Sequence, residues 1–209
     1  MTNNWRKTPL VRVLGSAASW FLFALCFTLL YSVSQVVMGL GGSCASGGPY
    51  EIAVECPDSV VAFAPLSIWG GLIAVGISLY FAQGFGTPLT TWGWPILFVG
   101  LGIAFLMAGG AVGWGIGIMF VIMGLVPLVL ELRASAQRVF LGSRNAAGTQ
   151  FREGDRARRS LLSMGLPNTE DAVSPSGIDW LLSLVVLAVA AGGGYLVGVA
   201  WFAAASSAG

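Results

Sequence analysis

The feature that most constrains this chain is the length of its stretches without a charged residue. No Asp, Glu, Lys or Arg occurs at residues 13–50, 59–130 or 180–209. A membrane-spanning helix needs about 20 predominantly apolar residues, and ordinary soluble domains carry about 25% charged residues, whereas this chain carries 9%. The first and last stretches each hold one span, and the middle stretch holds three. The sequence therefore predicts an all-α integral membrane protein with five transmembrane helices.

The expected spans lie at residues 14–39, 61–83, 91–107, 111–130 and 180–203. The alternative is a single helix through 91–130. At 1.5 Å per residue such a helix would be about 60 Å long, which is twice the hydrocarbon thickness of about 30 Å. Ala108-Gly109-Gly110 lies at its midpoint and is typical of a tight turn. We therefore expect a hairpin of two short, nearly upright helices.

The basic residues test that hairpin independently. All ten fall into two groups: Arg6, Lys7 and Arg12 precede the first span, and seven arginines lie between Arg133 and Arg159. Basic residues near span ends stay in the cytoplasm, so an even number of spans must separate the two groups. Four spans meet this condition and three do not. The N-terminus is therefore expected inside and the C-terminus outside.

This topology divides the chain into three regions. Residues 1–130 are expected to form a four-helix transmembrane bundle with an outer loop at 40–60. Residues 131–179 form a cytoplasmic arginine-rich segment, and residues 180–209 form the fifth span with an outer tail. The first apolar stretch exceeds the roughly 7–15 apolar residues of a signal peptide, so we expect it to remain as a span.

The outer loop contains two of the three cysteines, Cys44 and Cys56. Disulfides form and persist outside the cytoplasm, and closing a loop of this size stabilises a fold by about 3 kcal/mol on the chain-entropy argument. A metal site needs more ligands of this kind than the loop offers. We therefore expect a Cys44–Cys56 disulfide. The loop is either a stapled connector or a docking surface for a partner.

Glycines spaced four residues apart mark faces on which the expected helices can pack. Gly109, Gly113 and Gly117 follow this spacing, and Gly194 and Gly198 repeat it in the last span. Helices in a bilayer associate through close contact between small residues. Such faces pack either within the chain or against another subunit. The last span is the better candidate for an external contact, because a long cytoplasmic segment tethers it.

The cytoplasmic segment contains a basic cluster of four residues, Arg152, Arg156, Arg158 and Arg159. A cluster of this kind binds anionic lipid headgroups, at about 1 kcal/mol per basic residue near the surface. The alternatives are docking on a cytoplasmic partner, or topology-setting charges alone. The segment is too small for an independent catalytic core.

The expected spans lack the residues of transport and catalytic chemistry. Ionisable side chains are costly inside a membrane and are retained there for function, and the expected spans contain none. The chain also has no histidine, which is the commonest general base and metal ligand. We therefore expect no enzymatic activity, no cofactor or metal, and no nucleic-acid partner.

The outer loop carries a family resemblance, in Cys44-Ala-Ser-Gly-Gly-Pro-Tyr50 and Cys56-Pro-Asp58. Together with four spans before an arginine-rich segment, it resembles a group of uncharacterised actinobacterial multi-pass proteins over roughly residues 10–140. One class that it is similar to, the lipid uptake coordinators, accompanies the mammalian-cell-entry lipid importers of mycobacteria. The resemblance implies an accessory subunit in the inner membrane that contacts an importer permease, and it carries over no catalytic residue.

The sequence therefore predicts a non-catalytic accessory or assembly subunit of a larger cell-envelope lipid transport complex. Such a subunit would lie in the inner (plasma) membrane as a multi-pass protein and act by helix packing. The alternative is a stand-alone small transporter, channel or lipid-handling membrane protein.

Overall fold

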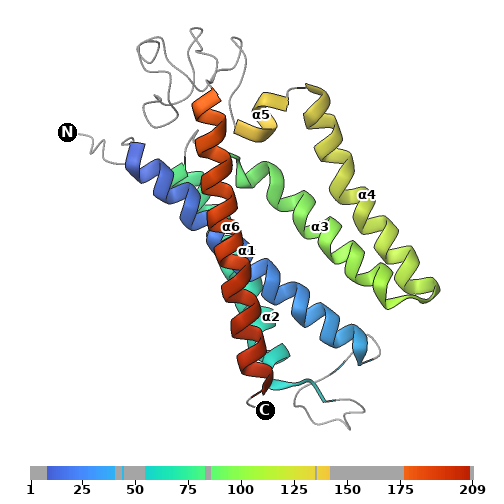
Figure 1. The fold of residues 1–209 in the computed structure, drawn as a ribbon. Helices are drawn as coiled ribbons and strands as arrows, with labels where there is room; N and C mark the ends of the chain where they lie inside the picture. Colours follow the sequence, from blue (N-terminus) through green and yellow to red (C-terminus); the bar gives the residue numbers. More distant parts are fainter. Residues whose placement is uncertain are drawn as a thin grey trace.

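Five long helices make up most of the structure. The computed structural model describes residues 9–40, 44, 55–82, 86–134, 136–141 and 177–207. The long helices are α1 (Pro9–Gly39), α2 (Asp58–Ile77), α3 (Leu89–Ala108), α4 (Gly110–Ala134) and α6 (Gly177–Ser207) (Figure 1). A π-helical turn, η2 (Ser78–Ala82), extends α2, and α5 (Ala136–Leu141) is a short helix after α4. All five long helices are apolar enough to cross a membrane, which confirms the all-α class and the five spans.

The hairpin expected between the third and fourth spans is present. α3 ends at Ala108, and the chain turns at Gly109 and Gly110, whose φ angles are +74° and +73°. Glycine adopts this left-handed backbone readily because it has no Cβ, whereas other residues are strained there. α4 then runs back beside α3 (Figure 1).

The central helix is α1. It packs along α6 and α2 and over a shorter length on α3. Half of its most apolar window is buried, against 22% or less in each of the other spans. Leu29 is fully buried where α1 meets the start of α2, and Trp20 is almost fully buried near the start of α3. The core of the molecule therefore follows α1.

The spans are grouped around α1. α4 packs extensively only on α3, while α6 packs along α1. α1, α2 and α6 therefore pack together, and α3 connects the α3–α4 hairpin to them. The reason is that the glycine face of α6 fits the backbone of α1, as described below.

The two ends of the molecule differ in what they bring together. At one end Leu141 of α5 packs against Val13 of α1 and Trp180 of α6. At the other end Cys44 and Cys56 pack where α1 ends and α2 begins, close to the end of α6 (Figure 1). Arg12, next to Val13 in α1, and Arg133, near the end of α4, both belong to the α5 end.

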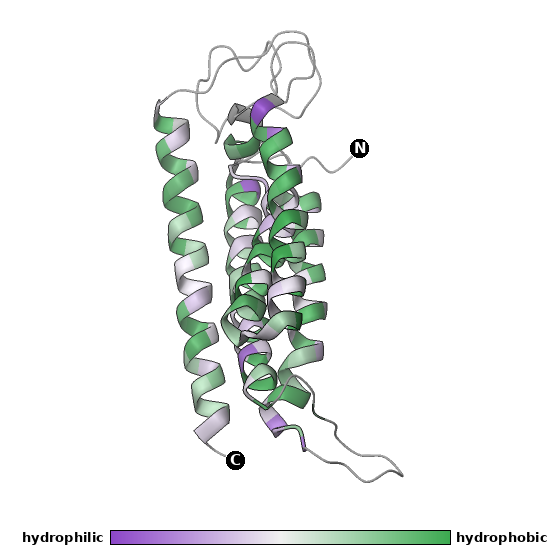
Figure 2. Ribbon diagram, turned by 90° about the vertical axis from the view of Figure 1, so that its right-hand side faces the viewer, coloured by the Kyte–Doolittle hydropathy of each residue, from purple (hydrophilic) through white to green (hydrophobic). Residues whose placement is uncertain are grey.

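The outer surface of the helices is apolar. Figure 2 shows hydrophobic residues along most of each helix. Large side chains such as Trp69, Val112 and Val189 are 67%, 73% and 71% exposed. Exposed apolar surface on this scale is rare in soluble monomers, and it is what a hydrocarbon environment requires of a membrane-spanning bundle.

Candidate functional site

The disulfide expected in the outer loop is present. Cys44 and Cys56 are joined with a Cα–Cα distance of 5.0 Å. Both pack against the apolar cluster around Leu29, Val33 and Val60. The disulfide therefore ties the end of α1 to the start of α2. Residues 45–54, which include most of the expected docking surface, lie outside the described residues.

Two glycines of α4 lie directly against α3. A Cβ at Gly117 would be 2.8 Å from the carbonyl oxygen of Gly102, and a Cβ at Gly113 would be 2.8 Å from that of Phe105. Real side chains do not approach this closely, so these backbones meet because the residues are glycine. Gly109 is a correction to the expected packing face, since a Cβ there would meet nothing within 4 Å. Its role is the turn, because it lies beyond the last residue of α3.

The glycines of the last span pack inside the chain. A Cβ at Gly194 would collide with the carbonyl oxygen of Phe21, and one at Gly198 would lie 3.1 Å from that of Leu25. The external contact considered for this face is therefore replaced by an internal one with α1. The basic cluster of Arg152, Arg156, Arg158 and Arg159 lies outside the described residues.

A buried arginine is the main polar residue that sequence reasoning missed. The expected first span began at residue 14, but α1 begins at Pro9 and therefore includes Arg12. The Arg12 side chain is 1% exposed, and Ser16 and Ser19 are buried as well. Residues four and seven positions apart share a helix face. That spacing is the signal in the sequence that would have placed Arg12 on a buried face.

The face of α1 that bears Arg12 meets two other elements. Ser16 and Ser183 of α6 both lie beside Gly86, in the connector that leads into α3. The hydroxyl oxygens of Thr87 and Ser183 are 3.5 Å apart. The connector is therefore held by polar contacts between α1 and α6, and it fixes where α3 starts.

Three tryptophans hold backbone carbonyls that lie outside regular helix hydrogen bonding. The indole N–H of Trp20 donates to the connector carbonyl of Thr87 at 2.8 Å. Trp92 donates to Val139 in the last turn of α5 at 2.9 Å. These residues join α1 to the connector and α3 to α5. Trp92 therefore fixes the position of α5 against α3.

The third tryptophan, Trp94, donates to a backbone carbonyl of α4 that lacks its usual helix donor. Pro127 has no N–H and cannot bond the carbonyl four residues earlier, which is that of Met123. The indole N–H of Trp94 donates to this carbonyl at 3.1 Å. A backbone carbonyl without a hydrogen-bond donor costs several kcal/mol when it is surrounded by hydrocarbon. Trp94 therefore stabilises the hairpin at a defined point.

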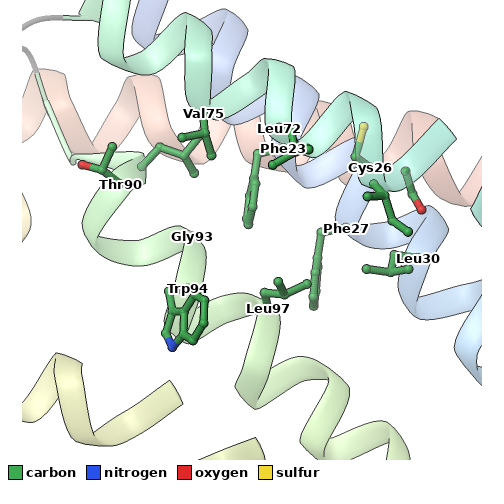
Figure 3. Close-up of a pocket in the computed structure, with 14 residues that line it drawn as sticks. Phe23, Cys26, Phe27, Leu30, Leu72, Val75, Thr90, Gly93, Trp94 and Leu97 are labelled. Atoms are coloured by element: carbon green, nitrogen blue, oxygen red, sulfur yellow. The ribbon is translucent and has the colours of Figure 1, made fainter. Parts of the chain in front are cut away.

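An apolar pocket of about 410 Å³ lies between α1, α2 and α3 (Figure 3). Phe23 and Phe27 of α1 form its floor, with parallel rings whose centroids are 6.3 Å apart. α2 contributes Gly71 to one wall, and α3 contributes Gly93 to another. None of the lining residues is charged. The pocket exists because α2 and α3 barely touch each other.

A second hollow of about 350 Å³ adjoins this pocket at the start of α3. Thr90 and Trp94 line both spaces. The second hollow also contains Thr91 of α3 and Glu131 of α4, and we call it the polar recess. The two spaces are therefore neighbours, and we treat them as one combined site that is apolar between the helices and polar at the start of α3.

The combined site has no feature of a metal centre. Within the part of the chain that the structure describes, no group of three or more metal-ligating side chains comes together. The side chains that surround the pocket instead offer a shaped apolar surface, and those of the recess offer two hydroxyl groups and a carboxylate.

No protein-family model, curated protein or solved structure matches this chain.

Proposed function

We propose that this chain is a non-catalytic accessory subunit that packs in the membrane against a larger cell-envelope transport complex. The observation that carries the proposal is how little α4 contacts its own chain. α4 packs extensively only on α3, and 11% of its most apolar window is buried. A span held on one side alone offers most of its surface to another membrane protein.

The outward face of α4 has the small-residue spacing of helix contacts in membranes. Gly113 and Gly117 face α3, whereas Ala111 and Gly115 are exposed. A Cβ at Gly115 would meet nothing within 4 Å. Small residues four positions apart let two helices approach closely in lipid. α4 thus has two such faces, of which α3 uses one, and this supports a partner helix on the other.

The chemistry of the chain also supports an accessory role. It has no histidine, and the Asp, Glu, Lys and Arg residues that the structure describes lie near the helix ends. The resemblance of Cys44-Ala-Ser-Gly-Gly-Pro-Tyr50 supports a lipid importer permease as the partner, in the inner (plasma) membrane of an actinobacterium. In this proposal the N-terminus faces the cytoplasm, and the Arg152–Arg159 region contacts anionic lipid headgroups or the partner.

The test is affinity purification in mild detergent with a substitution on the open face. Gly115→Leu places a large side chain where a partner helix would approach. Gly192→Leu on α6 is the matched control, since Gly192 is exposed and its Cβ would also meet nothing within 4 Å. Overpacking costs about 1–3 kcal/mol, so we expect affinity for co-purifying transport subunits to fall about 5–150-fold.

The expected result is a fixed ratio of transport-complex subunits with the wild type and with Gly192→Leu, and their loss with Gly115→Leu. Recovery of the tagged chain alone, or an equal loss with both substitutions, contradicts the proposal.

A second candidate function is a lipid-handling protein that acts alone, and the pocket between α1, α2 and α3 favours it. The two functions separate in vesicles that contain only the purified chain. Lipid movement in those vesicles supports the second candidate and contradicts the accessory role, because an accessory subunit has no activity without its complex.

A further inference from the structure

We propose that the pocket between α1, α2 and α3 binds one acyl chain of a membrane phospholipid, whose ester groups lie in the polar recess at Thr90 and Thr91. The inference rests on the geometry of this site and holds whether or not the chain is an accessory subunit. It uses a different surface from the outward face of α4.

The pocket opens sideways from the helices. Ile68, Leu72 and Trp94 form its rim and are 54%, 58% and 50% exposed, whereas Phe23 and Cys26 at its floor are 8% and 3% exposed. The rim belongs to spans, so hydrocarbon lies outside it. Water needs two to four polar partners to occupy a cavity, and this lining does not supply them. The occupant of the pocket is therefore a lipid acyl chain and not water.

The size of the pocket suits part of an acyl chain. Its volume of about 410 Å³ exceeds the roughly 150 Å³ of an apolar protein cavity that binds benzene. Along α3 the lining runs from Leu89 to Leu97, which is about 12 Å at 1.5 Å per residue. The parallel rings of Phe23 and Phe27 line the pocket on the α1 side. The pocket therefore has room for several methylene groups of a lipid chain beside these rings.

The polarity of the site gives the lipid a direction. Thr90 and Val75 lie at one end of the pocket and Leu30 at the other (Figure 3). The polar recess joins the Thr90 end, because Thr90 and Trp94 line both spaces. The Ser67 hydroxyl also lines the pocket, but it donates to the carbonyl of Ala64 at 2.9 Å. A phospholipid with its ester groups beside Thr90 and Thr91 and its chain running toward Leu30 therefore meets the hydroxyl groups of the recess at its polar end.

Two glycines keep the pocket open. Gly71 lies at the centre of the α2 wall, since the lining residues of α2 include Ser67, Ile68, Leu72 and Val75 on either side of it. A Cβ at Gly71 would meet nothing within 4 Å. On the opposite wall, a Cβ at Gly93 would make only ordinary contacts, the nearest at 3.6 Å with Phe23. Larger side chains at either position fit the backbone and take up the space of the lipid chain.

The test is photo-crosslinking of the full chain in phosphatidylcholine vesicles. The vesicles contain a small fraction of phosphatidylcholine with a diazirine in one acyl chain, either near the ester or near the middle of the chain. Mass spectrometry then locates the adducts. We expect the diazirine near the ester to label the region of Thr90 and Trp94, and the one near the middle of the chain to label the region of Leu30 and Leu97.

Gly71→Leu and Gly93→Leu fill the pocket from opposite walls. Each buried methylene contributes about fourfold to binding, so excluding two or more lowers pocket adducts at least about tenfold. Adducts on the lipid-facing surface of α6 serve as the internal reference. Gly76→Leu is the matched control, because Gly76 is on α2, its Cβ would meet nothing within 4 Å, and it does not line the pocket.

Uniform labelling of all lipid-facing surfaces, or equal pocket labelling in wild type and both filled variants, overturns the proposal. If one of the two filled variants fails to fold, as shown by loss of its helical circular dichroism signal, the pocket labelling of the other variant tests the proposal. The dependence on diazirine position is measured in the wild type and needs no variant. If the adduct position does not depend on the diazirine position, both the proposed direction of the lipid and its binding in the pocket are contradicted.

Discussion

At the scale of single residues, the structure is organised by polar groups that the lipid would otherwise leave without partners. Trp20, Trp92 and Trp94 each donate an indole N–H to a backbone carbonyl on another element. Each of these bonds joins two elements that are distant in sequence. Tryptophan serves here as a long-range hydrogen-bond donor as well as an apolar side chain.

Trp94→Phe removes the donor to the Met123 carbonyl, and we expect it to lower the free energy of unfolding by about 1–3 kcal/mol. Pro127→Ala supplies a backbone N–H to the same carbonyl. In that background we expect Trp94→Phe to cost less, with a coupling of about 1 kcal/mol in a double-mutant cycle. Denaturant unfolding in detergent micelles measures all four proteins. Strictly additive costs contradict the shared role of the two residues.

Single residues also show what the sequence does and does not determine. Gly109 and Gly117 look alike as members of one spaced series, yet Gly109 turns the chain and Gly117 packs on α3. The spacing of residues predicts that they share a helix face only if they belong to one continuous helix. The helix is interrupted at Gly109. Arg12 lies before the apolar stretch, but α1 begins at Pro9, so the start of the apolar stretch does not mark the start of the helix.

At the scale of elements, each span has one or more faces of small residues, and the partner of each face determines the fold. α4 uses Gly113 and Gly117 against α3. α6 uses Gly194 and Gly198 against α1. The glycine spacing predicted these faces, but it did not predict their partners, because the same close approach serves any neighbouring helix.

Gly117→Leu is expected to destabilise the α3–α4 hairpin by about 1–3 kcal/mol or more, because the added side chain meets the backbone of Gly102. Gly115→Leu, on the opposite face of the same helix, is expected to change stability by less than about 0.5 kcal/mol. Thermal unfolding of the purified variants checks both values. Equal destabilisation by the two substitutions contradicts the assignment of the packing face.

Gly194→Leu is expected to separate α6 from α1, since its side chain meets the backbone of Phe21. The measurement is disulfide crosslinking between cysteines introduced at Ala24 and Ala191 in a background without native free thiol. We expect crosslinking to fall in the Gly194→Leu variant and to persist with Gly192→Leu. Persistent crosslinking in both variants shows that Gly194 is not required for the contact.

At the scale of the whole molecule, the number of spans followed from the long charge-free stretches. The hairpin followed from the length of residues 91–130 and from the positions of the two basic groups. The arrangement of the spans did not follow, because apolar side chains serve equally well against lipid and against protein. The pocket between α1, α2 and α3 was missed for the same reason. Its residues lie on three separated helices, and its space comes from missing side chains at Gly71 and Gly93.

The disulfide is expected to stabilise the end of the molecule where α1 and α2 meet. Replacing Cys44 and Cys56 by serine should lower the free energy of unfolding by about 3 kcal/mol. Reductant should destabilise the wild type by a similar amount and leave the double variant unchanged. Unfolding with and without reductant measures this difference. A reductant effect that persists in the double variant contradicts it.

The outer-loop cysteines and the C-terminus provide a test of the membrane orientation. After mild reduction of intact cells, a membrane-impermeant maleimide is expected to label Cys44 and Cys56 from outside, and an added C-terminal tag is expected to be accessible there as well. Labelling only after permeabilisation contradicts the orientation that the basic residues predict.

The pairing of α1 with α6 sets an order for biogenesis. During synthesis α1 enters the membrane first, and the face that includes Phe21 and Thr28 stays in contact with lipid until α6 arrives. α2 and the α3–α4 hairpin can assemble earlier, because they need only neighbours already made. A chain whose synthesis stops between α5 and α6 therefore keeps the α6-binding face of its central helix in contact with lipid.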